Sequence, residues 1–304
     1  MSDSIVMAMD PAVRATIFGA AVGFMALEYG ASRLAHRHEE THDLAETAAS
    51  FGVALGQNVV RLVEAGLVAA PFALLYEHRL FEIDAATPLG LLALFLAVEF
   101  AYYWRHRASH RIRWMWATHS VHHSATKLNL TAAVRLGWTG AISGTFLFFA
   151  PLALIGFHPI AIVATLGANL LYQFFVHSEL APRLGPLEWV LNTPTHHRVH
   201  HASNASCLDK NYGGLLIVFD RLFGTFAAPP AEPLRYGLVG GTRSLNPVRI
   251  ALGEWAAMFA DARRARTLKG RLRALFAPPG AVIEPDAPPA LPSPNRPAIE
   301  ETRA

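Results

Sequence analysis

Long apolar runs alternate with short polar segments along the chain. The runs cover residues 12–29, 59–76, 86–104, 138–157 and 160–176. A helix needs about 20 mostly apolar residues to cross the hydrocarbon core of a bilayer. We therefore expect an all-α, polytopic membrane bundle with about four to five membrane-embedded helices.

The last two runs predict a helical hairpin. Only Gly156, Phe157, His158 and Pro159 stand between them, a tight turn punctuated by Gly and Pro. A hairpin that enters the membrane near Trp138 must return to the same side near residue 177. His158 lies at the far end of this hairpin, and we expect it to be structural.

Three polar residues interrupt the second run. Asn58, Arg61 and Glu64 are spaced by three, so they share one helix face. They either face the interior of the bundle, or the helix starts earlier in the chain and Arg61 reaches the membrane interface. The sequence leaves both open.

Composition supports the membrane class and restricts the chemistry. Apolar residues make up 52% of the chain and charged residues only 16%, which is few for a soluble protein. The single cysteine, Cys207, excludes an internal disulfide framework and a cysteine-ligated cluster. A formal net charge of +3 is modest, and we expect no nucleic-acid partner.

Histidines are the polar residues that stand out. Ten of the 15 fall into three groups, namely His106, His110, His119, His122 and His123, then His177, then His196, His197, His200 and His201. Histidines four residues apart share one face of a helix, and neutral imidazole is the commonest metal ligand. Nine or ten nitrogen donors exceed what one ion holds, so the pattern indicates two ions.

The topology puts these histidines on one side of the membrane. An aromatic cluster typical of a membrane interface ends the third run at Trp104, so His106 emerges there. The hairpin returns His177 to the same side, and residues 178–226 follow it. We therefore expect a cytosolic helical cap that holds the dimetal site. Its cytoplasmic placement is predicted by the Lys and Arg residues of the connections on this side, which are Arg33, Arg37, Arg105, Arg107, Arg111, Arg113, Lys127 and Arg135.

Glu99 lies two helical turns before His106. It is either an outer-shell carboxylate that orients an imidazole or an ordinary interfacial glutamate.

The pattern predicts four parts of the chain. These are N-terminal membrane helices over residues 1–85, a histidine-rich domain over 86–245, a basic amphipathic helix over 246–276 and a disordered Pro-rich tail over 277–304. Asn246 and Pro247 are a plausible N-cap and first turn of the third part. Its stripe of Val248, Leu252, Trp255 and Phe259, followed by Arg and Lys residues, is typical of a helix on an anionic membrane surface or of a solvated helix face.

Three other interpretations compete. His38-Glu39-Glu40-Thr41-His42 matches a zinc-protease pattern, but it lies in a short hydrophilic loop without a visible third ligand. A histidine-rich metal transporter would place its ligands near the middle of the spans, whereas these histidines cluster at one end. A scaffold protein would not need histidines spaced to bind a common metal ion.

The order of the histidines, interleaved with hydrophobic hairpins, resembles the fatty acid hydroxylase and sterol desaturase superfamily of membrane di-iron enzymes. The resemblance covers residues 86–226, and residues 192–225 resemble the branch that includes alkylglycerol monooxygenase. It implies that two iron ions are bound by His106, His110, His119, His122, His123, His177, His197, His200 and His201. His196 ranks lower, as an outer-shell or substitute ligand.

The resemblance also implies a reaction. Dioxygen is activated and a lipid such as a fatty acyl chain, a sterol-like lipid or an ether lipid is hydroxylated or desaturated. Electrons are expected from a separate protein or reductant, because the chain shows neither a dinucleotide fingerprint nor haem or iron–sulfur motifs. The residues leave open which lipid carbon reacts and which side chains other than the metal ligands are catalytic.

Overall fold

A computed structural model describes residues 11–241 and 243–281. This part of the chain is helical, with three isolated bridges and no β-strand. The all-α prediction is therefore confirmed. The predicted disordered tail beyond residue 281 lies outside the described residues.

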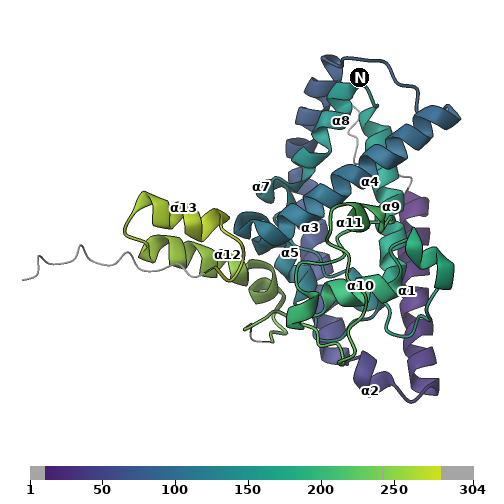
Figure 1. The fold of residues 1–304 in the computed structure, drawn as a ribbon, viewed down its shortest axis with the longest axis vertical. Coiled ribbons are helices and arrows are strands. Elements are labelled where there is room, and N and C mark those ends of the chain that lie inside the picture. The colour runs from purple at the N-terminus through teal and green to yellow at the C-terminus, as the bar shows by residue number, and fades with distance from the viewer. Residues whose placement is uncertain (1–10, 242, 282–304) are drawn as a thin grey trace, which may run out of the picture.

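Four long helices make the body of the molecule. They are α1 (Pro11–Leu34), α3 (Leu44–Glu77), α4 (Pro88–Arg111) and α9 (Pro159–Val176). In Figure 1, α1, α3 and α9 run along the long axis and α4 crosses them obliquely. Among the described residues, the helical stretch His38–Glu77 and α9 are long and apolar enough to cross a membrane.

The long helix α3 starts well before the apolar run that predicted it. The Asp43 side chain caps it by accepting hydrogen bonds from the backbone N–H groups of Ala45 and Glu46. Arg61 is exposed, and Glu64 accepts a hydrogen bond of 3.1 Å from the Ala141 N–H. Of the two alternatives for this segment, the earlier start is the one that the structure adopts.

The first arm of the predicted hairpin is not one helix, so that expectation was wrong. Three short helices replace it, α7 (Gly140–Ser143), the 3-10 helix η1 (Thr145–Phe148) and α8 (Ala150–Ile155). Gly144 has φ +75°, a left-handed conformation that ends α7. Apolarity predicted that this segment is embedded, but it could not predict that the helix is interrupted.

The hairpin turn itself is confirmed. Gly156 has φ +134°, and a Cβ there would lie 2.2 Å from the Phe81 carbonyl oxygen, so the turn needs glycine. His158 caps α9 through Nδ1, which accepts a hydrogen bond of 3.2 Å from the Ile160 N–H. His158 is structural, as predicted.

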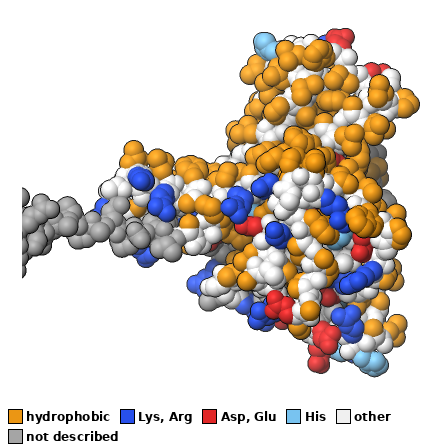
Figure 2. All heavy atoms as spheres, in the orientation of Figure 1, with side chains coloured by type: hydrophobic (Ala, Val, Ile, Leu, Met, Phe, Trp, Pro, Cys, Tyr) orange, Lys and Arg blue, Asp and Glu red, His pale blue; other side chains and the backbone are white. Residues whose placement is uncertain are grey.

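The core lies between α3, α4, α8 and α9. Leu94 and Val98 of α4 pack with Phe72, Ala153 and Ile162. Apolar side chains also cover the outside of the upper half of the molecule, whereas Lys, Arg, Asp and Glu gather in the lower half (Figure 2). A surface divided in this way is expected when one half lies in lipid and the other in water.

Shorter helices fill the rest of the body. They are α2 (His38–Thr41), α5 (Arg113–His123), α6 (Leu130–Ala133), η2 (Gly185–Trp189), α10 (Pro194–His201), η3 (Ala205–Cys207) and α11 (Val218–Leu222). The helices α5 and α10 lie against the ends of α4 and α9, and together they carry seven of the 15 histidines.

Two C-terminal helices, α12 (Pro247–Arg264) and α13 (Leu268–Phe276), form an arm that projects from the side of the body (Figure 1). Asn246 caps α12, as predicted, by accepting from the N–H groups of Val248 and Arg249. Most of the predicted apolar stripe is exposed. Trp255 is buried together with Met258, whereas other members of the stripe remain exposed.

Candidate metal centre

Four elements deliver the predicted ligand histidines. Helix α4 carries His106 and His110, and α5 carries His119, His122 and His123. Helix α10 carries His197, His200 and His201, and His177 is the C-cap of α9. The helical spacing and the hairpin therefore bring together residues that are up to 95 positions apart in the sequence, from 106 to 201.

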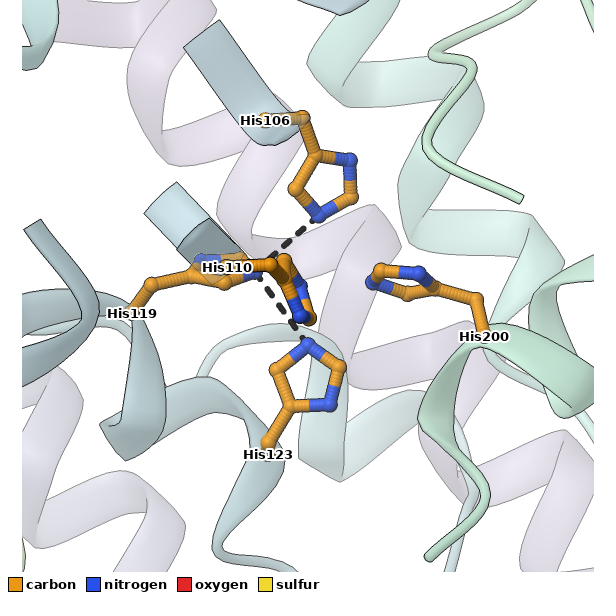
Figure 3. Close-up of side chains that lie close together, drawn as sticks. All are labelled: His106, His110, His119, His123 and His200. Atoms are coloured by element: carbon orange, nitrogen blue, oxygen red, sulfur yellow. Dashed lines mark hydrogen bonds between the residues drawn. The ribbon is translucent and has the colours of Figure 1, made fainter. Parts of the chain in front are cut away.

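The nine imidazoles form two groups, and the candidate ligand atoms of each group lie within 4.8 Å of one another. The first group, which we call the five-histidine group, contains His106, His110, His119, His123 and His200. The second, the four-histidine group, contains His122, His177, His197 and His201. Figure 3 shows the first group, in which His200 approaches from α10 and faces the histidines of α4 and α5.

Within each group the Nε2 atoms converge. The Nε2 of His119 lies 3.0 Å from that of His106 and 3.2 Å from that of His123. In the four-histidine group the Nε2 of His177 lies 3.0 Å from that of His122 and 2.9 Å from that of His197. Nitrogens bound at right angles to a metal, each about 2.1 Å from it, lie roughly 3 Å apart. The observed distances therefore fit ligands of a shared ion.

The opposite ring nitrogens are held by backbone carbonyl groups. His106 Nδ1 donates to the Tyr212 carbonyl at 2.8 Å, His177 Nδ1 to the Gln173 carbonyl at 2.6 Å and His200 Nδ1 to the Lys210 carbonyl at 2.9 Å. A carbonyl oxygen only accepts, so the proton of each neutral ring is on Nδ1. The Nε2 lone pair is then free to bind a metal.

Burial keeps these rings neutral. Desolvation lowers the pKa of His177 to about 4, against the smaller raising effect of its hydrogen bond to the Gln173 carbonyl. It lowers the pKa of His200 to about 4 in the same way. At neutral pH both imidazoles are uncharged, which is the form that binds metal.

Some of the buried ring nitrogens have no partner in the described part of the chain. His110 Nε2 and His200 Nε2 are inaccessible to water and form no hydrogen bond. An unpaired buried polar atom is destabilising. A metal ion in the five-histidine group would use both lone pairs, so the residues present fit a metal.

The segment that supplies two of these carbonyls has an unusual backbone. Asp209 and Asn211 have φ values of +59° and +57°, and they alternate with Lys210 and Tyr212, whose carbonyls bind the two histidines. Asn and Asp tolerate this left-handed conformation better than other non-glycine residues. The sequence gives no other clue to this role, and we did not predict it.

Two buried side chains hold this segment in place. Asn211 donates to the carbonyls of His196 and Ala227 and accepts from the Ala227 N–H. The Asp220 carboxylate accepts from the backbone N–H groups of Tyr212 and Gly213, both at 2.7 Å. Both side chains are fully buried. Their positioning role was not predicted, because their partners come from tertiary structure.

Glu99 is not bonded to an imidazole among the described residues. One carboxylate oxygen accepts from the N–H groups of Leu215 and Leu216, each at 2.9 Å, and the other accepts from the Asn169 side chain. The Asn169 amide also accepts from Gln173, whose backbone carbonyl binds His177. Any orienting effect of Glu99 on a ligand is therefore indirect.

His196 belongs to neither group. Its Nδ1 lies 3.5 Å from the Thr193 N–H, as part of the capping box that starts α10, and its ring packs edge-on against Phe226. The expectation of a substitute ligand has no support in this geometry.

The protease-like motif does not assemble a metal site. His42 has an extended backbone after the single turn of α2, so it does not share a helix face with His38. Its Nδ1 pairs with the Thr41 hydroxyl, and its Nε2 lies 3.7 Å from a Glu28 carboxylate oxygen. Neither His38 nor His42 joins a group of candidate ligands in the described residues.

Together these features define a class of protein, namely an all-helical protein with two adjacent clusters of neutral imidazoles beside an apolar helical bundle. Comparison with known families agrees with this class. The model of the fatty acid hydroxylase family matches residues 91–225, which include all nine histidines.

Three relatives illustrate the similarity. An alkylglycerol monooxygenase of Xenopus tropicalis is 39% identical over 203 residues, which are 67% of this chain and 45% of the relative. The Danio rerio alkylglycerol monooxygenase is 50% identical over 144 residues, or 47% of this chain and 32% of the relative. An ornithine lipid hydroxylase of Rhizobium tropici is 29% identical over 198 residues, or 63% of this chain and 59% of the relative.

These matches support the predicted resemblance to the fatty acid hydroxylase superfamily, nearest to its alkylglycerol monooxygenase branch. The chain spans less than half the length of the alkylglycerol monooxygenases that it matches. No solved structure matches the chain.

Proposed function

We propose that this protein is a multi-pass membrane oxidoreductase that uses dioxygen and two iron ions to hydroxylate a lipid. The observation that carries the proposal is the convergence of nine neutral imidazoles into two groups. His106, His110, His119, His123 and His200 would hold one ion, and His122, His177, His197 and His201 the other. Nitrogen-rich sites suit iron among several divalent metals, and the superfamily favours iron.

The relatives support the class of substrate. Their names specify alkylglycerols and ornithine lipids, which combine a polar headgroup with a long hydrocarbon chain. An ether lipid is therefore the first candidate. The metal pair would supply the activation of dioxygen when bound. One oxygen atom enters a C–H bond of the lipid and the other leaves as water, with two electrons and two protons from an external donor.

The protein's own residues would do three things. The carbonyls of Lys210, Tyr212 and Gln173 fix the tautomer and the direction of three imidazoles. Burial of the rings keeps water away from the ligands. The exposed apolar surface of the bundle, which includes Phe100 and Phe175, lets a lipid chain approach from the bilayer.

We further propose that the histidine side faces the cytoplasm, where the electron donor would reach it. The Arg and Lys residues of the connections support this orientation. So does the surface in Figure 2, where the charged half carries the loops around α2 and α10.

The test is a reaction with purified protein in lipid nanodiscs loaded with ferrous iron. An alkylglycerol and an ornithine lipid are offered separately with isotopically labelled dioxygen and a reductant. The proposal expects one product that carries one labelled oxygen. His177→Ala, which leaves three donors in the four-histidine group, should abolish it, and His158→Ala, which alters the cap of α9 and a ring contact with Tyr76, should retain it. Metal uptake without lipid oxidation would instead favour a metal-binding or transport protein.

A further inference from the structure

Trp114 connects the α12–α13 arm to the membrane-embedded part of the chain. Its ring lies 4.8 Å from Trp255 and 6.0 Å from Phe259 of α12, and 6.1 Å from Phe276 of α13. Its indole N–H donates to the carbonyl of Ile142 in α7 at 3.0 Å. Trp114 therefore contacts both helices of the arm and, through its indole N–H, α7.

Each helix of the arm leaves an apolar stripe exposed. On α13, Leu268, Leu272 and Phe276 are spaced by four residues and are 72%, 48% and 50% exposed. On α12, the exposed stripe contains Val248, Leu252 and Phe259. Such spacing gives one continuous face on each helix. Trp255, Met258 and Ala274 pack against the body or each other. Phe259 and Phe276 contact Trp114 on one side and are still 39% and 50% exposed, so each stripe keeps an unpacked apolar surface.

Basic side chains flank the apolar stripe of α13. Residues 263–276 contain Arg263, Arg264, Arg266, Lys269, Arg271 and Arg273 and no acidic residue. On the helix, Lys269 and Arg273 lie to one side of the stripe and Arg271 to the other. Lys269 and Arg273 form no ion pair among the described residues. Their charge is available to an external anion.

The apolar surface of the arm continues into that of the bundle. Ile142 and Leu147, on the interrupted segment from α7 to η1, are 60% and 55% exposed, and Ile142 touches the cluster around Trp114. In Figure 2, apolar side chains follow the edge of the arm that faces the apolar half of the molecule, and Lys and Arg lie below them. A Trp and two Phe between an apolar surface and a basic one are typical of a membrane interface.

We propose that the α12–α13 arm is an in-plane membrane anchor that binds the headgroups of anionic phospholipids. Its stripes enter the boundary between headgroups and acyl chains, while Lys269, Arg271 and Arg273 extend to the phosphates. Continuity with the lipid-facing surface favours a bilayer over a protein partner. This proposal does not depend on the chemistry of the metal centre.

The anchor would also set the depth of the metal centre. Arg113, the first residue of α5, bonds Glu254 at 2.9 Å and Asp261 at 2.8 Å, both on α12. The arm is thus tied to the helix that carries His119, His122 and His123. An arm in the headgroup layer places these histidines close to that layer.

The experiment places a fluorescent bimane probe on the arm of the full chain in nanodiscs. The only native cysteine, Cys207, is 1% exposed, so an introduced thiol is labelled selectively. Leu272→Cys carries the probe on the stripe. Ala257→Cys is the matched control, because this exposed residue points roughly opposite to Phe259 on α12. We expect brominated acyl chains to quench the Leu272 probe and aqueous iodide to quench the Ala257 probe.

A second part of the experiment tests the role of the basic side chains. The labelled protein is compared in phosphatidylcholine discs with and without phosphatidylglycerol, and with Lys269→Gln and Arg273→Gln added. Anionic lipid should increase the protection of the Leu272 probe from iodide, and each lost charge should weaken this protection by about fivefold. Iodide quenching of the Leu272 probe in both kinds of disc would overturn the proposal. So would protection that requires a second protein molecule, shown by dilution to one chain per disc.

Discussion

The Nε2 atoms of His122 and His177 lie 3.0 Å apart, although 55 residues separate the two histidines in the sequence. His177 has its proton on Nδ1, which donates to the Gln173 carbonyl, so its Nε2 presents a lone pair to the neighbouring ring. The same lone pair faces the Nε2 of His197 at 2.9 Å. The single lone pair of His177 cannot accept full hydrogen bonds from both His122 and His197. A cation placed among the three Nε2 atoms would attract the lone pair of each.

This contact predicts the metal content of the protein. Purified protein should contain about two iron ions per chain, one for each histidine group. His177→Ala should lower the content to about one, because it removes a donor from the four-histidine group. Elemental analysis of the purified protein measures this. His158→Ala is the control, since it changes a helix cap and should keep both ions.

The two groups should differ in their tolerance of a lost ligand. His122 and His123 are neighbours in α5, but His122 belongs to the four-histidine group and His123 to the five-histidine group. His122→Ala leaves three nitrogen donors for one ion, whereas His123→Ala leaves four. We therefore expect His122→Ala to lose an ion and His123→Ala to keep most of both, with affinity lowered about 10-fold to 100-fold. Competition with a chelator gives the affinities, and equal losses in both variants would contradict the division into these two groups.

The candidate ligands were predictable because their spacing is a local property of the sequence. Spacing by four within a helix, the hairpin turn at Gly156 and the Asn246 cap are all encoded by residues close together in the sequence. The hairpin also placed His177 correctly, since a chain that enters and leaves an apolar layer must return to the same side. The nine members of the two groups are the histidines that the family resemblance implied as ligands, and His196, the tenth candidate, lies outside both groups.

What surrounds the ligands was not predictable in the same way. Asp220 and Glu99 bind backbone N–H groups, which carry no residue-specific signal in the sequence. The break at Gly144 within an apolar run was not predictable for another reason. Hydrophobicity indicates burial in lipid or protein, but it does not indicate whether a helix is continuous.

Asn211 should be sensitive to both its backbone and its side chain. Its φ of +57° costs an ordinary residue about 1 kcal/mol, and its amide forms three buried hydrogen bonds. Asn211→Gly loses only the hydrogen bonds, whereas Asn211→Ala loses them and keeps the backbone strain. We expect the alanine variant to be less stable than the glycine variant by about 1 kcal/mol. Thermal unfolding in detergent compares them, and an alanine variant as stable as the glycine one would mean that the backbone is not strained here.

Glu99 should act by holding the chain segment that follows the Tyr212 carbonyl. Glu99→Leu leaves the N–H groups of Leu215 and Leu216 without acceptors, which should destabilise the protein by about 2–5 kcal/mol. Glu99→Gln keeps one oxygen for these two donors and should lose much less. Unfolding in detergent gives the stability, and iron content shows whether the ligand groups survive. If Glu99→Leu were as stable as the unchanged protein, water would have to reach residues 215 and 216, and the link between this carboxylate and the metal centre would be wrong.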